Sequence, residues 1–442
     1  MYFHGPWLSH YTGCCLFASL SFFIIFHLSC INCSVRKILI SAYAVSPDHG
    51  SEPGLGWNWC VRLAKSCELF VITEGEFRDR IEAALPALPQ GKNMHFFYNP
   101  VSERVRKMCW NQGDWRFYLH YRVWQKKTLA IARKICSEYP IDLIHHLNMI
   151  GFREPGYIWK INGIPYVHGP INCKFEYPLS YWDGASQGER LKIRLKDAIS
   201  RLQMKYSGRF RRAIHHADAV ITASSDSQKL LKRYLGVDSY MINETGCDVT
   251  QSPHSFVEKE GLDVLWVGRL SLYSKLPDLA LRAVGRTGNP RIRLHFVGTG
   301  DALGLRNLSH TLGVEDSCHW YGAVPHRQVL DMMGKMDVLL LTSVIEGTPH
   351  VVLEAIANGL PVVCFDTCGQ GDIVDERSGI KIPLTEPEDS MRRFADILNR
   401  LEAHPEILRR LSAGCAGRVD DLSWDTLIGK VTGLYSELIT HP

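Results

Sequence analysis

The chain has 442 residues, of which 45% are hydrophobic and 22% charged, and its formal net charge is +4. This length exceeds what one hydrophobic core supports, so two or three domains are expected. The composition is that of a globular protein and excludes the disordered and fibrous classes, and the weak net charge gives no argument for a nucleic-acid partner. Fourteen scattered cysteines lack paired zinc-finger spacing, which predicts reduced structural thiols and no bound metal.

The N-terminal segment 1–34 contains a stretch, 11–31, that is apolar enough to cross a bilayer. No Lys or Arg precedes it, unlike in a secretory signal, and the first positive charges, Arg36 and Lys37, follow it. The positive-inside rule then keeps the rest of the chain in the cytoplasm. The alternative is that the segment is absent from the mature protein, which would begin at Val35. Both interpretations predict a cytoplasmic main body.

After residue 35, short apolar runs alternate with longer amphipathic stretches, as in sheets whose parallel strands are joined by helices. A first series of predicted strands comprises residues 38–42, 69–73, 141–145, 166–168 and 219–223. A second series comprises residues 264–267, 294–298, 338–342 and 361–365. The polar stretch 245–261 between the two series, with its Gly and Pro, is the predicted linker.

This pattern predicts an α/β protein with two doubly wound, Rossmann-like domains, at 35–250 and 257–422. A C-terminal helix at 423–442 is expected to pack back on the first domain. Because ligands gather at the carboxyl ends of the strands in such sheets, we expect a binding cleft between the domains.

The segment 343–363 carries two glutamates, Glu346 and Glu354, around a predicted helix start. Thr348 suits the N-cap and Pro349 the first turn, with the helix running to residue 358. The free N–H groups at that start would bind a phosphate, and the carboxylates would bind hydroxyl groups on either side. A nucleotide sugar has this layout. Two glutamates on a solvated helix face are the alternative, which fits poorly with so apolar a helix.

Further polar residues follow other predicted strands. Arg269 and Lys275 come after the strand at 264–267 and would neutralise a diphosphate. The glycine-rich loop containing Gly50 follows the first strand and allows close backbone approach, although it is not a dinucleotide fingerprint. His145 ends another strand beside His146, and a strand-end histidine either contacts substrate or is structural.

The chain resembles retaining glycosyltransferases of family four, which have the two-domain GT-B fold. The resemblance covers residue 36 to the C-terminus and is carried by the following stretches: EGTPHVVLEAIANGLPVV, with its E-x7-E spacing, VGRL with the later Lys275, VGTGD at 297–301, WYGAVPHRQV at 320–329, and LSWDTLIGKVTGLYSEL. GSEPGLGWNW and GFREPGYIWK are similar to a bacterial subgroup.

The resemblance implies a role for each matching residue. Glu346 would contact the donor sugar together with Gly347, Thr348 and Pro349, Glu354 would hold the ribose, and Arg269 and Lys275 the diphosphate. Gly298, Tyr321 and Gly50 would complete the donor site. Glu346, His145 and Arg269 would be the catalytic groups, with His146 as the alternative histidine because the family's H-x-H appears here as HHL. Arg269 and Lys275 are one residue further apart than is usual in the family.

The function implied is transfer of a sugar from a nucleotide sugar with retention of configuration, by same-face attack and without metal or cofactor. A nucleotide-sugar epimerase of the same architecture and a non-catalytic carbohydrate-binding protein are the alternatives. A nicotinamide-dependent oxidoreductase is disfavoured because no strand is followed by a G-x-G-x-x-G fingerprint.

Two stretches of the first domain suggest where the acceptor binds. Residues 110–127 are dense in aromatic and basic residues, and residues 190–212 hold nine basic residues and one acid with apolar residues at helical spacing. A basic amphipathic helix suits an anionic membrane surface, whereas a solvated helix packed on its domain is the alternative. We expect a lipid-linked or saccharide acceptor at the inner face of the membrane, in bacterial surface-polysaccharide synthesis, and no nucleic-acid partner.

Overall fold

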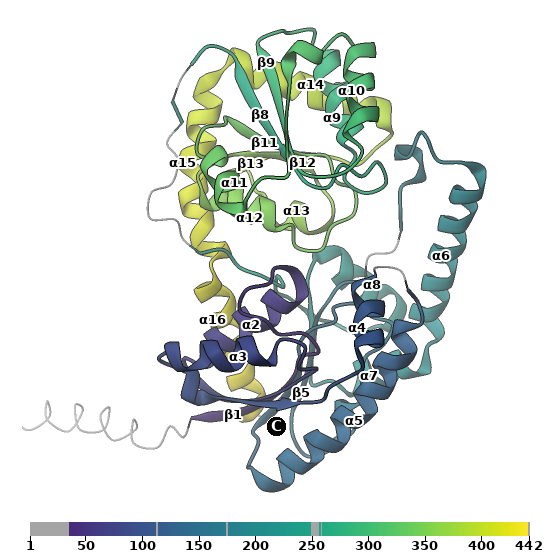
Figure 1. Ribbon diagram of the computed structural model, residues 1–442, viewed down its shortest axis with the longest axis vertical. Coiled ribbons are helices and arrows are strands. Elements are labelled where there is room, and N and C mark those ends of the chain that lie inside the picture. Colours follow the sequence, from purple (N-terminus) through teal and green to yellow (C-terminus); the bar gives the residue numbers. More distant parts are fainter. Residues whose placement is uncertain (1–34, 112–113, 174–175, 249–255, 258, 441–442) are drawn as a thin grey trace, which may run out of the picture. The chain divides into compact units, whose positions relative to one another are not determined.

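The computed structural model describes residues 35–111, 114–173, 176–248, 256–257 and 259–440 (Figure 1). The predicted membrane-crossing stretch 11–31 and residues 249–255 and 258 of the predicted linker lie outside these ranges. Within the described ranges, every helix is too short or too polar to cross a membrane.

The first sheet has seven parallel strands in the order β3-β2-β1-β4-β5-β6-β7. Its strands are β1 Arg36–Ser41, β2 Cys67–Thr73, β3 Met94–Tyr98, β4 Leu143–His146, β5 Tyr166–Ile171, β6 Ala219–Thr222 and β7 Tyr240–Met241. Its helices are α2 Ser51–Leu63, α3 Arg78–Ala84, α4 Glu103–Trp110, α5 Phe117–Glu138, α6 Gln187–Tyr206, α7 Gly208–His216 and α8 Ser225–Leu235.

Helices cover both faces of this sheet, which explains why most residues of its central strands are buried. Ile38 and Ile40 of β1 pack with Trp59 of α2, whereas Leu39 between them packs on the opposite face with Ile135 of α5.

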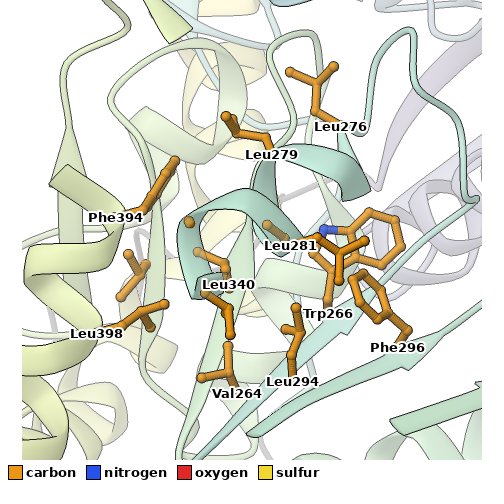
Figure 2. Close-up of a cluster of buried hydrophobic side chains, with 14 of the residues drawn as sticks. Val264, Trp266, Leu276, Leu279, Leu281, Leu294, Phe296, Leu340, Phe394 and Leu398 are labelled. Carbon is orange, nitrogen blue, oxygen red and sulfur yellow. The ribbon is translucent and has the colours of Figure 1, made fainter. Parts of the chain in front are cut away.

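The second sheet has six parallel strands in the order β10-β9-β8-β11-β12-β13. Its strands are β8 Leu262–Val267, β9 Ile292–Val297, β10 Cys318–Gly322, β11 Val338–Leu341, β12 Val362–Phe365 and β13 Gly379–Ile382. Its helices are α9 Pro277–Thr287, α10 Ala302–Thr311, α11 His326–Met333, α12 His350–Ala357, α13 Cys368–Ile373, α14 Pro387–Ala403 and α15 Pro405–Leu422. Figure 2 shows one face of its core, where Trp266 and Phe296 from the strands lie near Leu281 of α9.

The last helix, α16 (Trp424–Thr440), belongs to the core of the first sheet although α15 before it belongs to that of the second. Val431 and Tyr435 are fully buried there, with Trp59 of α2 in the same cluster. The chain therefore runs from the first core to the second and, with α16, returns to the first.

The predicted strand runs all fall on observed strands, with ends that differ by a few residues. Four further strands, β3, β7, β10 and β13, were not predicted, and all four lie at the edges of the sheets. Helix α2 begins at Ser51, so the glycine-rich stretch after Gly50 is helical rather than a loop.

Candidate active site

The loop after β11 carries the first glutamate of the E-x7-E stretch. Because β11 and β8 are neighbours in a parallel sheet, the loops that follow them lie side by side, and the Val344 N–H donates to the Ser274 carbonyl at 3.1 Å. Lys275 then forms an ion pair with Glu346, and the two side chains are only 21% and 13% exposed. An ammonium group has three N–H donors, so this pair leaves capacity for a second anionic acceptor.

The helix start differs slightly from the prediction. Pro349 is the N-cap, because its carbonyl oxygen accepts the first helical hydrogen bond, from the Leu353 N–H at 3.4 Å, and α12 begins at His350. Thr348 is buried, and its N–H donates to Glu244. The helix ends at Ala357, and Gly359 follows with a φ of 75°.

Glu354, in the second turn of α12, is paired with His326 at 2.9 Å between Oε1 and Nε2. His326 is the first residue of α11 and is 67% exposed. It lies in the WYGAVPHRQV stretch, but the sequence assigned it no role. Each glutamate of the E-x7-E pair thus has its own basic partner.

The loops after β8 and β9 run against each other. Gly298 has a φ of 144°, and a Cβ on it would lie 1.7 Å from the Gly268 carbonyl oxygen, so only glycine fits. Arg269 follows Gly268 and is exposed. Its carbonyl oxygen accepts from the Ser271 N–H at 2.7 Å, while its side chain has no hydrogen-bond or ion-pair partner among the described residues. Tyr321, near the end of β10, is 42% exposed, and its hydroxyl lies 3.0 Å from His295 Nδ1. These positions share the carboxyl edge of the second sheet.

In the first sheet, Gly50 is the N-cap of α2, is exposed, and has open space where a side chain would lie. Nearby, Glu52 accepts hydrogen bonds from the N–H groups of Met149 and Ile150, both at 3.1 Å. Its burial raises the pKa of this carboxyl. The start of α2 is therefore tied to the loop that follows β4.

His145 does not have the environment expected of a substrate contact. It is fully buried, its Nδ1 lies 2.6 Å from the Tyr435 hydroxyl, and its Nε2 lies 2.6 Å from the Gly169 carbonyl. Burial lowers the pKa of His145 to about 4, so the ring is neutral and both nitrogens are engaged. In this structure it connects β4 to α16 and β5.

His146 points to the opposite face of the sheet, as expected for the next residue of a strand. It is stacked on His168 with ring centroids 5.0 Å apart, and its Nδ1 is buried without a hydrogen-bond partner. Burial lowers its pKa to about 3.

The basic and aromatic stretches, 110–127 and 190–212, contain both buried and exposed side chains. Tyr121 and Trp124 of α5 are 1% exposed and pack around Tyr43, so they do not form part of an outer face, contrary to the prediction. Trp110 and Trp115 are 51% and 69% exposed. Phe210 of α7 is likewise buried.

Helix α6 has an apolar stripe that no other described element covers. Its members are 44–67% exposed and recur every three or four residues: Leu191, Leu195, Ile199, Leu202 and Tyr206. The opposite face buries Ile193, Ser200 and Met204. Leu195 and Ile199 of the stripe line part of a cavity of about 680 Å³, together with Trp115, Lys192, Lys196 and Arg209.

Metal-binding clusters of three or more His, Cys, Asp or Glu residues do not occur in the part of the chain that the structure describes. Eight cysteines of this part are free thiols: Cys60, Cys109, Cys136, Cys173, Cys247, Cys318, Cys364 and Cys415.

The fold is shared with solved glycosyltransferases of the GT-B class. A structure of Anabaena Alr3699/HepE in complex with UDP and glucose superposes with a TM-score of 0.56 at 16% identity, covering 91% of this chain and 100% of that one. At this identity the similarity establishes the fold alone.

Residues 250–414 match the family Glycosyl transferases group 1. A D-inositol 3-phosphate glycosyltransferase of Streptomyces bingchenggensis is 31% identical over 191 residues, which is 40% of this chain and 41% of that protein. The lipopolysaccharide 1,6-galactosyltransferase of Salmonella typhimurium is 32% identical over 142 residues, 31% of this chain and 38% of that protein. The matches span about two fifths of these curated relatives, and they support placing this part of the chain in the glycosyltransferase class.

Proposed function

We propose that the protein is a glycosyltransferase that moves a sugar from a nucleotide sugar to an acceptor with retention of configuration. The observation that carries this proposal is the pairing of Lys275 with Glu346 at the carboxyl ends of adjacent strands, beside the close approach of Gly268 and Gly298. A positive group for phosphate and a carboxylate for sugar hydroxyls thus lie together.

In this proposal the donor's diphosphate contacts Lys275 and Arg269, and its backbone neighbours are Gly298 and the Gly347–Pro349 loop. Glu346 contacts the transferred sugar and Glu354 the ribose. The exposed Tyr321 and Gly50 border the donor, with Gly50 contributed by the first sheet.

The proposed reaction is a same-face displacement in which the departing phosphate oxygen helps to remove the acceptor's proton. The two cations stabilise the negative charge that develops on the leaving group, and no metal or cofactor is required. Since His145 is enclosed in the first core, the protein's contribution to catalysis is assigned to Glu346, Lys275 and Arg269.

The acceptor in this proposal is a lipid-linked saccharide at the inner face of a membrane, extended during bacterial surface-polysaccharide synthesis. The exposed apolar stripe of α6 supports this part, because basic residues of the same helix flank it and would face anionic lipid headgroups. The lipopolysaccharide-building relative is consistent with such an acceptor.

The test is incubation of the purified protein with a panel of UDP-, GDP- and dTDP-sugars, scoring release of nucleoside diphosphate. Release from one donor and an unchanged anomeric configuration in the product, read by NMR, are expected. Interconversion of two nucleotide sugars without transfer would instead identify an epimerase.

A further inference from the structure

Glu244 joins the segment after β7 to the loop that precedes α12. Its Oε1 accepts a hydrogen bond from the Thr348 N–H at 3.0 Å. Its own N–H donates in return to the Thr348 Oγ1 at 3.4 Å. This reciprocal pair connects a residue from the first sheet's side with the loop that carries Glu346 and Gly347.

The same loop packs directly on the Glu244 carboxyl group. A Cβ on Gly347 would lie 2.9 Å from Glu244 Oε1 and 3.1 Å from Asn172 Nδ2. From the other side, a Cβ on Gly369 would lie 1.7 Å from the Gly347 carbonyl oxygen. The Gly347 backbone is therefore confined between Glu244 and the start of α13.

Glu244 is itself held firmly and is nearly enclosed. It is 7% exposed, and Trp59 Nε1 of α2 donates to its carbonyl oxygen at 2.7 Å. Its second carboxyl oxygen, Oε2, is buried without a hydrogen-bond partner. Burying a carboxyl with an unpaired oxygen costs free energy, so this residue is poorly explained by stability alone.

We propose that Glu244 is a positioning residue that fixes the Gly347–Thr348 backbone, and through it Glu346, for the donor sugar. The inference rests on the proposed function of Glu346, but the Glu244–Thr348 contact is testable without any substrate. Sequence reasoning missed this residue because Glu244 precedes the predicted linker and belongs to no periodic pattern.

The contact is expected to respond to pH. Burial raises the pKa of Glu244 to about 7. The negative charges of Glu52 from α2 and Glu346 from the loop also raise this pKa, whereas the hydrogen bond from Thr348 lowers it. The charge of Glu346 is in turn paired with Lys275. Above pH 7 the ionised carboxylate is the stronger acceptor for the Thr348 N–H, and below pH 7 the protonated form is the weaker one.

The direct test is NMR of the protein labelled with 15N-threonine between pH 5.5 and 8.5, with Thr348→Ser to identify the resonance. The Thr348 amide should move downfield with a midpoint near pH 7, and Glu244→Gln should abolish that titration. Asp337→Asn is the matched control: Asp337 is another buried carboxyl that accepts a backbone N–H, from Asp263 at 2.7 Å, but it precedes β11 at the opposite edge of the sheet. A Thr348 amide that does not titrate, or that titrates equally in Glu244→Gln, overturns the proposal.

Kinetics supply the second test. At pH 8.5, Glu244→Gln should lower kcat/KM for the donor about tenfold, because a charged hydrogen bond becomes a neutral one. At pH 5.5 it should match the wild type, whose Glu244 is then protonated. An equal loss at both pH values, or no loss at either, contradicts a positioning role.

If Glu244→Gln does not fold, Glu244→Asp, which keeps the charge and shortens the reach to Thr348, should show an intermediate amide titration. A wild-type protein that releases nucleoside diphosphate from no donor refutes the proposed function, while the NMR result still decides the contact.

Discussion

Glu346 and Glu354 have different basic partners, Lys275 and His326, and different positions relative to α12. Glu354→Ala should therefore raise the Kd for UDP, whereas Glu346→Ala should chiefly lower kcat, because contacts to the transferred sugar matter most in the transition state. Loss of a hydrogen bond from a charged group predicts effects of about 10- to 100-fold. Isothermal titration calorimetry measures the Kd for UDP, and initial-rate kinetics measure kcat.

Glu388→Ala is a suitable control, since Glu388 of α14 forms an exposed ion pair with Arg286 of α9. It should change neither quantity. Equal and mild effects of the two signature variants would contradict the assigned roles.

The buried carboxyl of Glu244 also predicts how stability depends on pH. Its ordinary pKa is 4.5 and its folded pKa is about 7, so the native state binds more protons than the unfolded state between these values. The free energy of unfolding should consequently fall as pH rises through this window, by about 3 kcal/mol from this one group.

Glutamine does not titrate, so Glu244→Gln lacks this loss of stability. Between pH 4.5 and pH 7, the free energy of unfolding of the wild type should therefore fall relative to that of the variant. Urea denaturation followed by tryptophan fluorescence measures this. Parallel pH dependences for the two proteins would show that Glu244 is not protonated in that range.

At the scale of elements, substitutions in the exposed stripe on α6 test membrane binding without affecting folding. Leu195 and Leu202 are 59% and 57% exposed, so Leu195→Ser with Leu202→Ser should leave the unfolding midpoint unchanged. The double variant should bind anionic liposomes about 10- to 100-fold less tightly, because two side chains lose apolar burial in the lipid. Flotation of a chain beginning at Val35 measures binding independently of residues 1–34.

Leu303→Ser on α10 is the matched control, because Leu303 is an equally exposed leucine (70%) on the second sheet's side. Binding should also weaken in high salt, since cations near the surface contribute on the order of 1 kcal/mol each. If the protein does not float with anionic vesicles, the acceptor is a soluble molecule.

At the scale of the whole molecule, α16 ties the C-terminus to the first core through the Tyr435 hydroxyl and His145 Nδ1, at 2.6 Å. Tyr435→Phe leaves that nitrogen buried and unpaired, which should cost about 1–3 kcal/mol of stability. Tyr206→Phe, at a tyrosine 65% exposed, should cost nothing measurable. Thermal unfolding of both variants tests this, and an unchanged Tm for Tyr435→Phe would refute the structural role given to His145.

The proposed charge arrangement predicts that transfer does not need a metal. Lys275 and Arg269 supply the positive charge at the diphosphate, so activity should survive excess EDTA with less than a twofold change in kcat. Donor turnover before and after chelation measures this. Complete loss that Mg²⁺ restores would show that the cations do not replace a metal.

The sequence by itself determined the central strands and the fold class. Strand β11 and the residues Ile38–Ile40 of β1 are buried on both faces of their sheets and are all apolar, and such a continuous apolar run can be recognised without knowledge of the neighbouring strands. The strands at the sheet edges, β3, β7, β10 and β13, have at most two buried residues each and lack that signal. Their pairing is decided by the adjacent strand.

The sequence also placed Glu346 and Lys275 at strand ends, because strand order in a parallel sheet brings those ends to one edge. Only the tertiary structure decided which strand-end residues are accessible. His145 and His146 look equivalent in sequence, yet α16 covers the first and His168 stacks on the second. The contact of Glu244 with Thr348 likewise joins residues 104 positions apart. Local periodicity carries no information about such pairs, because their proximity depends on how separate elements pack.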